Sequence, residues 1–136
     1  MYPEELILPM KNELTQNGFE DLNTPESVEA ILNKKETTLI VVNSVCGCAA
    51  GALRPGVLMS LSGSKKPAHM GTVFAGFDKP ATEAARGYML PFPPSSPSIA
   101  LFKEGELVHM VERHHIEGRT AEMIAENLKM AYEEYC

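Results

Sequence analysis

Residues 37–48 read TTLIVVNSVCGC, an apolar run that leads within a few residues to two cysteines separated by one glycine. The part Thr37–Val42 is rich in β-branched residues and has no charged one, which is typical of a strand buried on both faces and suggests a central parallel strand. A cysteine at the junction of such a strand and a helix lies where free backbone N–H groups and the helix dipole favour a negative charge. This stretch therefore predicts a reactive thiolate at the end of a central strand.

The two cysteines of this motif are expected to differ in role. Cys46 comes at or just before the first helical turn, so it is the better-placed nucleophile toward a disulfide sulfur. Cys48 is expected to be less exposed, one step inside the helix. A disulfide between residues this close must fit a narrow geometric window, which predicts a strained and easily reduced bridge. Gly47 is expected to help by adopting unusual backbone angles.

The sequence around the motif predicts alternating helices and strands in a single domain, residues 1–136. Pro55 is expected to kink the helix that follows the cysteines, and Asp78 is expected to cap the next helix. The expected helices cover residues 9–19, 25–32, 49–61, 80–86 and about 120–136, and the expected strands cover 37–42, 72–76, 98–102 and 107–111. The last two strands form a hairpin. The pattern predicts an α/β fold, with a mixed central sheet, helices on both faces and an extra N-terminal helix.

Composition and charge narrow the range of functions. The chain has 136 residues and a formal net charge of −6, which argues against nucleic-acid binding, since phosphates require clustered Lys and Arg. No apolar run approaches the ~20 residues of a membrane span, and the N-terminus lacks the features of a signal peptide. A cytoplasmic location without membrane contact is expected. Three cysteines are too few for a disulfide scaffold, and Cys136 at the chain end is expected to be a bystander.

Two other interpretations of the cysteine pair compete with redox chemistry. Free cysteines are often small buried hydrophobes, but a glycine between them right after a buried strand argues against that interpretation. A metal or iron–sulfur carrier would need further ligands. The remaining candidate ligands are Cys136, His69, His109, His114 and His115. None of them stands at a ligand spacing. His114 and His115 are expected at a strand end, where adjacent side chains point to opposite faces. No bound metal is expected.

A second element of the expected site is Ser96-Pro97-Ser98, just before the apolar strand 98–102. A proline at this point can take the cis form, which proteins normally keep for a specific turn. Ser96 and Pro97 are therefore candidate substrate-binding residues. The neighbouring Pro91, Pro93 and Pro94 are interpreted as stiffening the loop.

In the Cys-Gly-Cys motif and the Ser96-Pro97 segment, the chain resembles the thioredoxin superfamily and, more specifically, the bacilliredoxin family. The thioredoxin-like part is the order of strand, cysteine and kinked helix, followed by Ser96-Pro97 and the hairpin. The bacilliredoxin-like part runs from Asn43 through the Cys-Gly-Cys motif to Arg54-Pro55, and it includes Ser44. The resemblance spans nearly the whole chain, and it makes Asn43, Ser44, Gly47 and Arg54 candidate supports of the motif.

The resemblance implies an activity on mixed disulfides. Bacilliredoxins are linked to bacillithiol, a low-molecular-weight thiol, and remove it from proteins joined to it by a disulfide. By resemblance, Cys46 is the nucleophile, Cys48 the second cysteine and Pro97 the cis-proline beside the substrate. No bound cofactor is implied; bacillithiol is the thiol co-substrate and bacillithiolated or disulfide-containing client proteins are the partners. A general disulfide isomerase or reductase that uses the Cys46–Cys48 pair remains an alternative, as does a metal or iron–sulfur carrier.

Two departures from thioredoxin itself bear on mechanism. The chain has no tryptophan, so the aromatic residue before the thioredoxin motif is absent. The strand segment Leu39–Val42 carries no carboxylate, whereas thioredoxins keep a buried acid there to take the proton of the second thiol. This absence favours exchange by Cys46 alone with a small thiol.

Overall fold

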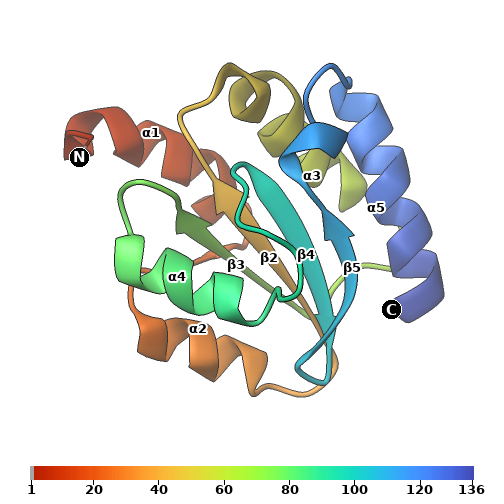
Figure 1. The fold of residues 1–136 in the computed structure, drawn as a ribbon. Helices are drawn as coiled ribbons and strands as arrows, with labels where there is room; N and C mark the ends of the chain where they lie inside the picture. The colour runs from red at the N-terminus through yellow and green to blue at the C-terminus, as the bar shows by residue number, and fades with distance from the viewer. Residues whose placement is uncertain (1) are drawn as a thin grey trace.

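The central strand of the sheet is β2 (Thr37–Asn43), and all seven of its residues are buried. The computed structural model, which describes residues 2–136, pairs β2 in parallel with β3 (His69–Phe74) and antiparallel with β4 (Ser98–Lys103). β1 (Glu20–Asp21) pairs in parallel with β3, and β5 (Glu106–Val111) pairs antiparallel with β4. The five-stranded sheet therefore has the order β1-β3-β2-β4-β5 (Figure 1). The predicted mixed sheet and its terminal hairpin are confirmed.

Helices cover both faces of this sheet (Figure 1). One face packs against α1 (Glu4–Thr15), α3 (Arg54–Ser60) and α5 (Ala121–Tyr135), and the other packs against α2 (Pro25–Leu32) and α4 (Lys79–Gly87). β2 serves both cores because its side chains alternate. Leu39 and Val41 belong to the first core, and Ile40 and Val42 belong to the second. The predicted three-layer arrangement with an additional N-terminal helix is confirmed.

Two helices begin where the sequence predicts, and their caps explain why. Thr24 accepts a hydrogen bond from the N–H of Ser27 at 3.1 Å, and Pro25 occupies the first helical turn of α2. Thr120 accepts one from the N–H of Met123 at 3.1 Å at the start of α5. In both cases a hydroxyl satisfies one of the N–H groups that a helix N-terminus leaves free.

The opening helix begins earlier than the sequence predicts. It covers Glu4–Thr15, so Pro9 lies inside it and does not start it, and the predicted range 9–19 was wrong at both ends. Glu4 and Glu5 in the first turn favour the positive end of the helix dipole. The buried residues Ile7, Lys11 and Leu14 recur at helical spacing, and this stripe holds the helix to the sheet despite the proline.

Two further local predictions need correction. The predicted helix 49–61 is divided: a π-helical turn (η1, Ala49–Leu53) precedes α3, and Pro55 is the second residue of α3. Asp78 stands at the N-cap position of α4, but its side chain makes no capping bond. Its carboxylate accepts the N–H of Phe74 at 3.3 Å and pairs with Lys11 at 2.8 Å.

Lys11 is a buried cation that ties α1 to the edge of the sheet. Its ammonium group lies 2.8 Å from Asp78 and 3.1 Å from Asp21, and 5.1 Å from the ring centroid of Phe77. Burial lowers the pKa of Lys11, but hydrogen bonds to Asp78 and Asp21 and their charges outweigh this, so the net pKa is raised. The ammonium is therefore charged at neutral pH. Asp21 belongs to β1, a strand the sequence did not predict because it is two exposed charged residues long.

No helix among residues 2–136 is both long enough and apolar enough to cross a bilayer.

Replacing Lys11 with methionine should lower the free energy of unfolding by about 3–5 kcal/mol, because the change leaves the carboxylate of Asp78 buried without its partner. Asp78 and Lys11 side chains are each only 7% exposed. Lys65→Met is a matched control, since the Lys65–Glu133 pair is 4.0 Å apart and its side chains are 49% and 69% exposed. That control should change the free energy by less than about 1 kcal/mol. Urea denaturation measures both, and equal effects would contradict the structural role of Lys11.

Candidate active site

Cys46 lies at the point where β2 gives way to a helix. The N–H groups of Ala49 and Ala50 donate to its carbonyl oxygen at 2.9 and 3.3 Å, so Cys46 precedes the first helical turn. Its own N–H donates to the hydroxyl of Ser44 at 3.1 Å, and the N–H of Cys48 donates to its sulfur at 3.4 Å. The sulfur therefore faces the free N–H groups of a helix N-terminus, an environment that favours a thiolate.

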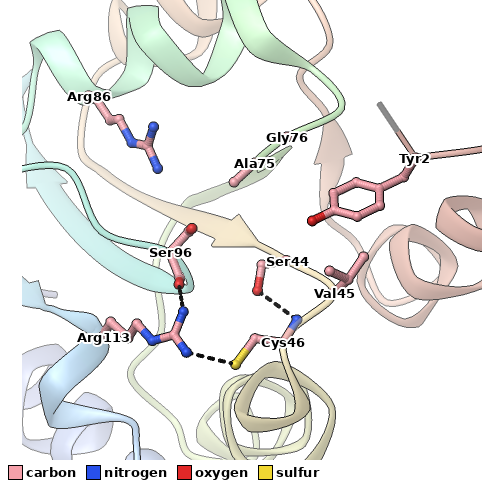
Figure 2. Close-up of a pocket in the computed structure, with 9 residues that line it drawn as sticks. All are labelled: Tyr2, Ser44, Val45, Cys46, Ala75, Gly76, Arg86, Ser96 and Arg113. Carbon is pink, nitrogen blue, oxygen red and sulfur yellow. Dashed lines mark hydrogen bonds between the residues drawn. The ribbon is translucent and has the colours of Figure 1, made fainter.

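The two sulfurs of the motif are neighbours, and an arginine adjoins one of them. Cys46 Sγ and Cys48 Sγ are 2.7 Å apart, and both cysteines are free. Arg113, which stands in a 3₁₀ turn (η2, Arg113–His115) directly after β5, donates from Nη2 to Cys46 Sγ at 3.3 Å (Figure 2). Its Nη1 donates to the carbonyl oxygen of Ser96 at 2.9 Å, and its Nε pairs with Glu117 at 3.2 Å.

These contacts shift the pKa values of the two thiols in opposite directions. The hydrogen bond from Cys48 lowers the pKa of Cys46 most, and the N–H groups of Cys48 and Ala49 and the charge of Arg113 lower it further, against the effect of burial. Burial, together with the negative charge of Cys46, raises the pKa of Cys48 to about 11. Of the two thiols, Cys46 therefore loses its proton first, which favours Cys46 over Cys48 as the predicted nucleophile.

A buried arginine holds the backbone beneath the motif. Arg54 donates from Nη1 to Asn43 Oδ1 at 3.0 Å and to the Ser44 carbonyl oxygen at 3.1 Å, and its Nε lies 3.0 Å from Glu13 Oε1. Asn43 also accepts the N–H of Ser44 at 2.9 Å and donates to the carbonyl oxygen of Met10 at 3.2 Å. Three of the predicted supports, Asn43, Ser44 and Arg54, thus meet in one network directly below Cys46.

Gly47 is the fourth predicted support. With both cysteines free its backbone is helical and does not have a positive φ, so its help to a Cys46–Cys48 disulfide through unusual backbone angles stays a prediction. A Cβ atom at this position would meet no atom within 4 Å. The space beside the motif is therefore open, and glycine is not required there for folding.

Ser96 faces Cys46 across a cavity of about 450 Å³, into which the sulfur of Cys46 opens (Figure 2). The peptide bond between Ser96 and Pro97 is cis, a form that the sequence analysis allows for this proline. The bond between Leu90 and Pro91 is cis as well. Pro97 is buried, and it is Ser96 that lines the cavity. Both stay predicted substrate-binding residues.

Cys136 lies at the other end of the sheet. Its sulfur is 3.5 Å from the hydroxyl of Thr37, the first residue of β2, whereas Cys46 follows the last. Seven strand residues span roughly 20 Å at about 3.3 Å each. In this structure Cys136 is therefore out of reach of Cys46, in keeping with its interpretation as a bystander.

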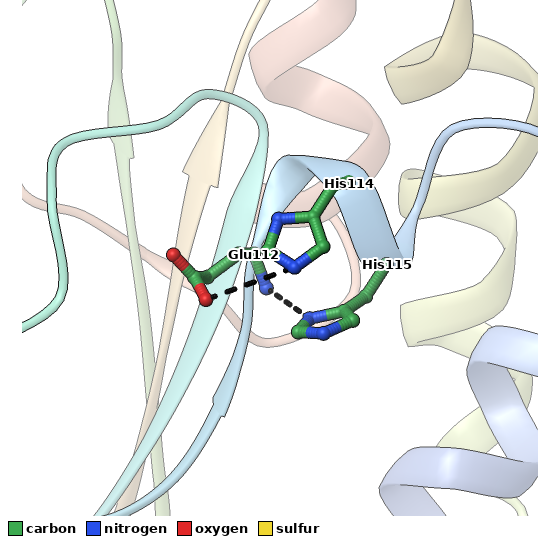
Figure 3. A group of neighbouring side chains, drawn as sticks. All are labelled: Glu112, His114 and His115. Carbon is green, nitrogen blue, oxygen red and sulfur yellow. Dashed lines mark hydrogen bonds and ion pairs between the residues drawn. The ribbon is translucent and has the colours of Figure 1, made fainter.

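His114 and His115 do not lie on a strand end with opposite orientations, and this prediction was wrong. They stand in the 3₁₀ turn η2, with ring centroids 4.0 Å apart, and the N–H of Glu112 donates to Nδ1 of His115 at 3.1 Å (Figure 3). Side-chain ligand atoms of Glu112, His114 and His115 lie within 4.8 Å of one another. Within residues 2–136 no third His, Cys, Asp or Glu ligand atom forms such a group with Cys46 and Cys48.

Known proteins match this chain over nearly its whole length. A family described as disulphide isomerase matches residues 2–136. A bacilliredoxin of Cytophaga hutchinsonii is 66% identical over 98% of this chain and 99% of its own length. Another, of Halalkalibacterium halodurans, is 52% identical over 99% of this chain and 94% of its own.

The chain belongs to the bacilliredoxin family.

Solved structures establish the fold of this bacilliredoxin-family chain. A thioredoxin mutant from Halobacterium salinarum superposes with a TM-score of 0.61 at 18% identity, covering 85% of this chain and 88% of its own. Mitochondrial thioredoxin 3 of Saccharomyces cerevisiae, in its oxidised form, gives a TM-score of 0.60 at 11% identity, covering 87% and 96%. The predicted thioredoxin-like fold is confirmed. Together with the bacilliredoxin relatives, it makes this protein a thiol–disulfide oxidoreductase.

Arg113 is the functional residue that the sequence analysis missed. The hairpin pairs Ile99 with Val111, so the chain just before β4 lies beside the chain just after β5. That register puts Arg113 next to the Ser96-Pro97 loop, and hence near the cysteine that the loop faces. A basic residue directly after the second hairpin strand was the available signal in the bacilliredoxin sequence.

Removing the charge of Arg113 should raise the pKa of Cys46, because the guanidinium no longer stabilises the thiolate. The measurement is the alkylation rate against pH in a Cys48→Ser, Cys136→Ser background, where Cys46 is the remaining cysteine. The parent midpoint should lie below that of a free cysteine, and Arg113→Gln should move it upward. Arg119→Gln, the same charge change at an exposed position outside the cavity, should not move it. Equal midpoints in all three proteins would contradict the role of Arg113.

Gly47→Ala should leave the free energy of unfolding unchanged or raise it by about 0.5–1 kcal/mol, because alanine favours helical backbone and meets no steric obstacle. Denaturant titration measures this. Gly76→Ala is the contrasting control: Gly76 has a φ of +82°, and a Cβ there would lie 2.8 Å from the Tyr2 ring. That variant should be destabilised. A loss of more than about 1 kcal/mol in Gly47→Ala would show that the motif needs glycine for folding.

Proposed function

We propose that this protein removes bacillithiol from client proteins to which the thiol is joined by a mixed disulfide, with Cys46 as the nucleophile. The observation that carries the proposal is the position of the Cys46 sulfur. It opens into a cavity of about 450 Å³ while Cys48, Arg113 and backbone N–H groups stabilise its thiolate. Cavities of this size hold small molecules. The bacilliredoxin names of the relatives supply bacillithiol as the thiol.

The first step transfers the small thiol to the protein. The thiolate of Cys46 attacks the bacillithiol-side sulfur of the mixed disulfide, a new bond forms between these two sulfurs, and the client leaves as a thiolate. Electrons balance within this exchange, so no cofactor is involved. Arg113 stabilises the attacking sulfur, and it also holds the Ser96 carbonyl, which fixes the opposite wall of the cavity.

The second step removes bacillithiol from Cys46 by one of two routes. A second bacillithiol thiolate can attack the bacillithiol sulfur of the adduct, which yields bacillithiol disulfide and Cys46 thiolate. Alternatively, Cys48 can attack the sulfur of Cys46, which yields a Cys46–Cys48 disulfide and free bacillithiol. Cys48 must lose its proton first, and this becomes easier once Cys46 carries the adduct, because the negative charge that raises the pKa of Cys48 is then gone.

A second candidate activity belongs to the same class. The matching family is described as disulphide isomerase, and the two sulfurs of the motif are 2.7 Å apart. A general isomerase or reductase would cycle through the Cys46–Cys48 pair on protein disulfides and would need both cysteines. Under either proposal the partners are client proteins of a reducing cytoplasm.

Replacing each cysteine in turn should separate these activities. Cys46→Ser should abolish removal of bacillithiol from a bacillithiolated client, since a hydroxyl is not ionised at neutral pH. Cys48→Ser should keep the first step and accumulate the adduct on Cys46, with turnover proportional to added bacillithiol. Intact-mass measurement after mixing detects the adduct directly.

Cys136→Ser is the matched control and should keep full turnover, because Cys136 lies at the far end of β2. An adduct on Cys48 in the Cys46→Ser protein, with turnover intact, would reverse the two roles. If Cys48→Ser loses all activity at every bacillithiol concentration, the general disulfide isomerase becomes the better description.

A further inference from the structure

Arg86 is a cation in the cavity that the proposed reaction does not use. It projects from α4, and Figure 2 shows its guanidinium pointing into the space above Ser96, on the side opposite Arg113. Arg113 is fully engaged by Cys46, Ser96 and Glu117, whereas Arg86 forms no hydrogen bond or ion pair with any of residues 2–136.

The Nε atom of Arg86 is buried and has no hydrogen-bond partner. Burial lowers the pKa of Arg86, and the nearby charge of Glu83 offsets this only in part. An arginine nevertheless keeps its charge in proteins. Buried polar groups are almost always satisfied, so the unpaired Nε of this half-buried arginine at the cavity wall points to a partner from outside the chain.

The charge of the cavity differs from that of the molecule. The chain carries a formal net charge of −6, but the residues that line the cavity include two arginines, Arg86 and Arg113, and no carboxylate. The hydroxyl of Tyr2 also points toward this space (Figure 2). Guanidinium groups bind carboxylates through paired hydrogen bonds, and a tyrosine hydroxyl can add another.

We propose that Arg86 forms an anion subsite that binds a carboxylate carried by the small thiol while its sulfur is joined to Cys46. The inference rests on the proposed function, which places the small thiol on Cys46, and it adds the chemistry by which the thiol is recognised. The reaction at Cys46 selects for a disulfide, and Arg86 selects for an acidic substituent on the half of that disulfide that enters the cavity.

The test uses three small symmetric disulfides that differ in charge and little in size: dithiodipropionate (anionic), bis(2-hydroxyethyl) disulfide (neutral) and cystamine (cationic). Second-order rate constants for adduct formation on Cys46 are measured in the Cys48→Ser, Cys136→Ser background, with Arg86 intact, Arg86→Gln or Arg86→Lys. Arg86→Gln should slow the anionic disulfide about tenfold, the loss expected for one charge-assisted hydrogen bond, and the neutral one less than about twofold. Arg86→Lys, which keeps the charge and loses the planar fork, should fall between.

Lys79→Gln is the matched control, because Lys79 is an exposed cation on the same helix that does not line this cavity. It should change the rates of the three disulfides little and equally. If Arg86→Gln slows the neutral and anionic disulfides alike, or if Lys79→Gln reproduces its effect, the subsite proposal is overturned while the proposed function stands. The proposed function fails as well if Cys46, with Arg86 intact, reacts neither with any of the three disulfides nor with a bacillithiolated client.

The source of the anion is resolved with two peptides, one with acidic and one with neutral residues beside the modified cysteine, each joined to mercaptopropionate. Arg86→Gln should slow both equally, since the carboxylate it binds is on the small thiol. A loss confined to the acidic peptide would assign Arg86 to the client and overturn the proposal. Thermal unfolding of each variant checks the fold, and Arg86→Lys keeps the test decisive if the glutamine variant does not fold.

Discussion

The guanidinium of Arg54 is buried where four segments of the chain meet, and the geometry of the site depends on it. It joins Glu13 of α1, Asn43 at the end of β2 and the carbonyl of Ser44, and it belongs itself to the first turn of α3. Because a buried charge requires such partners, the strand, the loop and the two helices can adopt only a narrow set of relative positions. Cys46 extends from this fixed loop, so its sulfur faces the cavity without any contact of its own to the core.

Much of the fold follows from patterns that are local in sequence. β2 was recognisable because the four consecutive residues Leu39–Val42 serve the two cores in alternation, so no polar residue interrupts this run. The hairpin and the caps at Thr24 and Thr120 were also predictable, since each depends on residues a few positions apart. The same holds for Cys46, whose thiolate is stabilised by Cys48, two positions along the chain, and by backbone N–H groups at the strand–helix junction. Its predicted position before the first helical turn agrees with the structure.

The features that escaped prediction depend on contacts between distant residues. Lys11 stands in an apolar stripe of α1, and its burial makes sense only beside Asp21 and Asp78, which lie ten and sixty-seven positions further along the chain. The sequence predicts Asp78 as a helix cap because its ion pair with Lys11, which lies far away in the sequence, cannot be recognised from local residues. Arg113 approaches Cys46 through the hairpin register, and Arg86 reaches the same cavity from a different helix. Basic residues whose partners lie far away in the sequence have no strong local sequence pattern that would predict their role.

The cationic cavity in an acidic protein has a consequence for how ionic strength sorts its ligands. At physiological salt, the interaction between exposed charges farther apart than about 8 Å is largely screened. The overall negative charge of the protein therefore has little effect on the binding of a large client. Partly buried groups at contact distance are screened much less. Discrimination by the acidity of the client surface is therefore lost in the medium of a cell, whereas discrimination by the charge of the molecule inside the cavity is retained. Under the proposed reaction, the protein would accept clients of different surface charge and still discriminate by the charge of the small thiol that they carry.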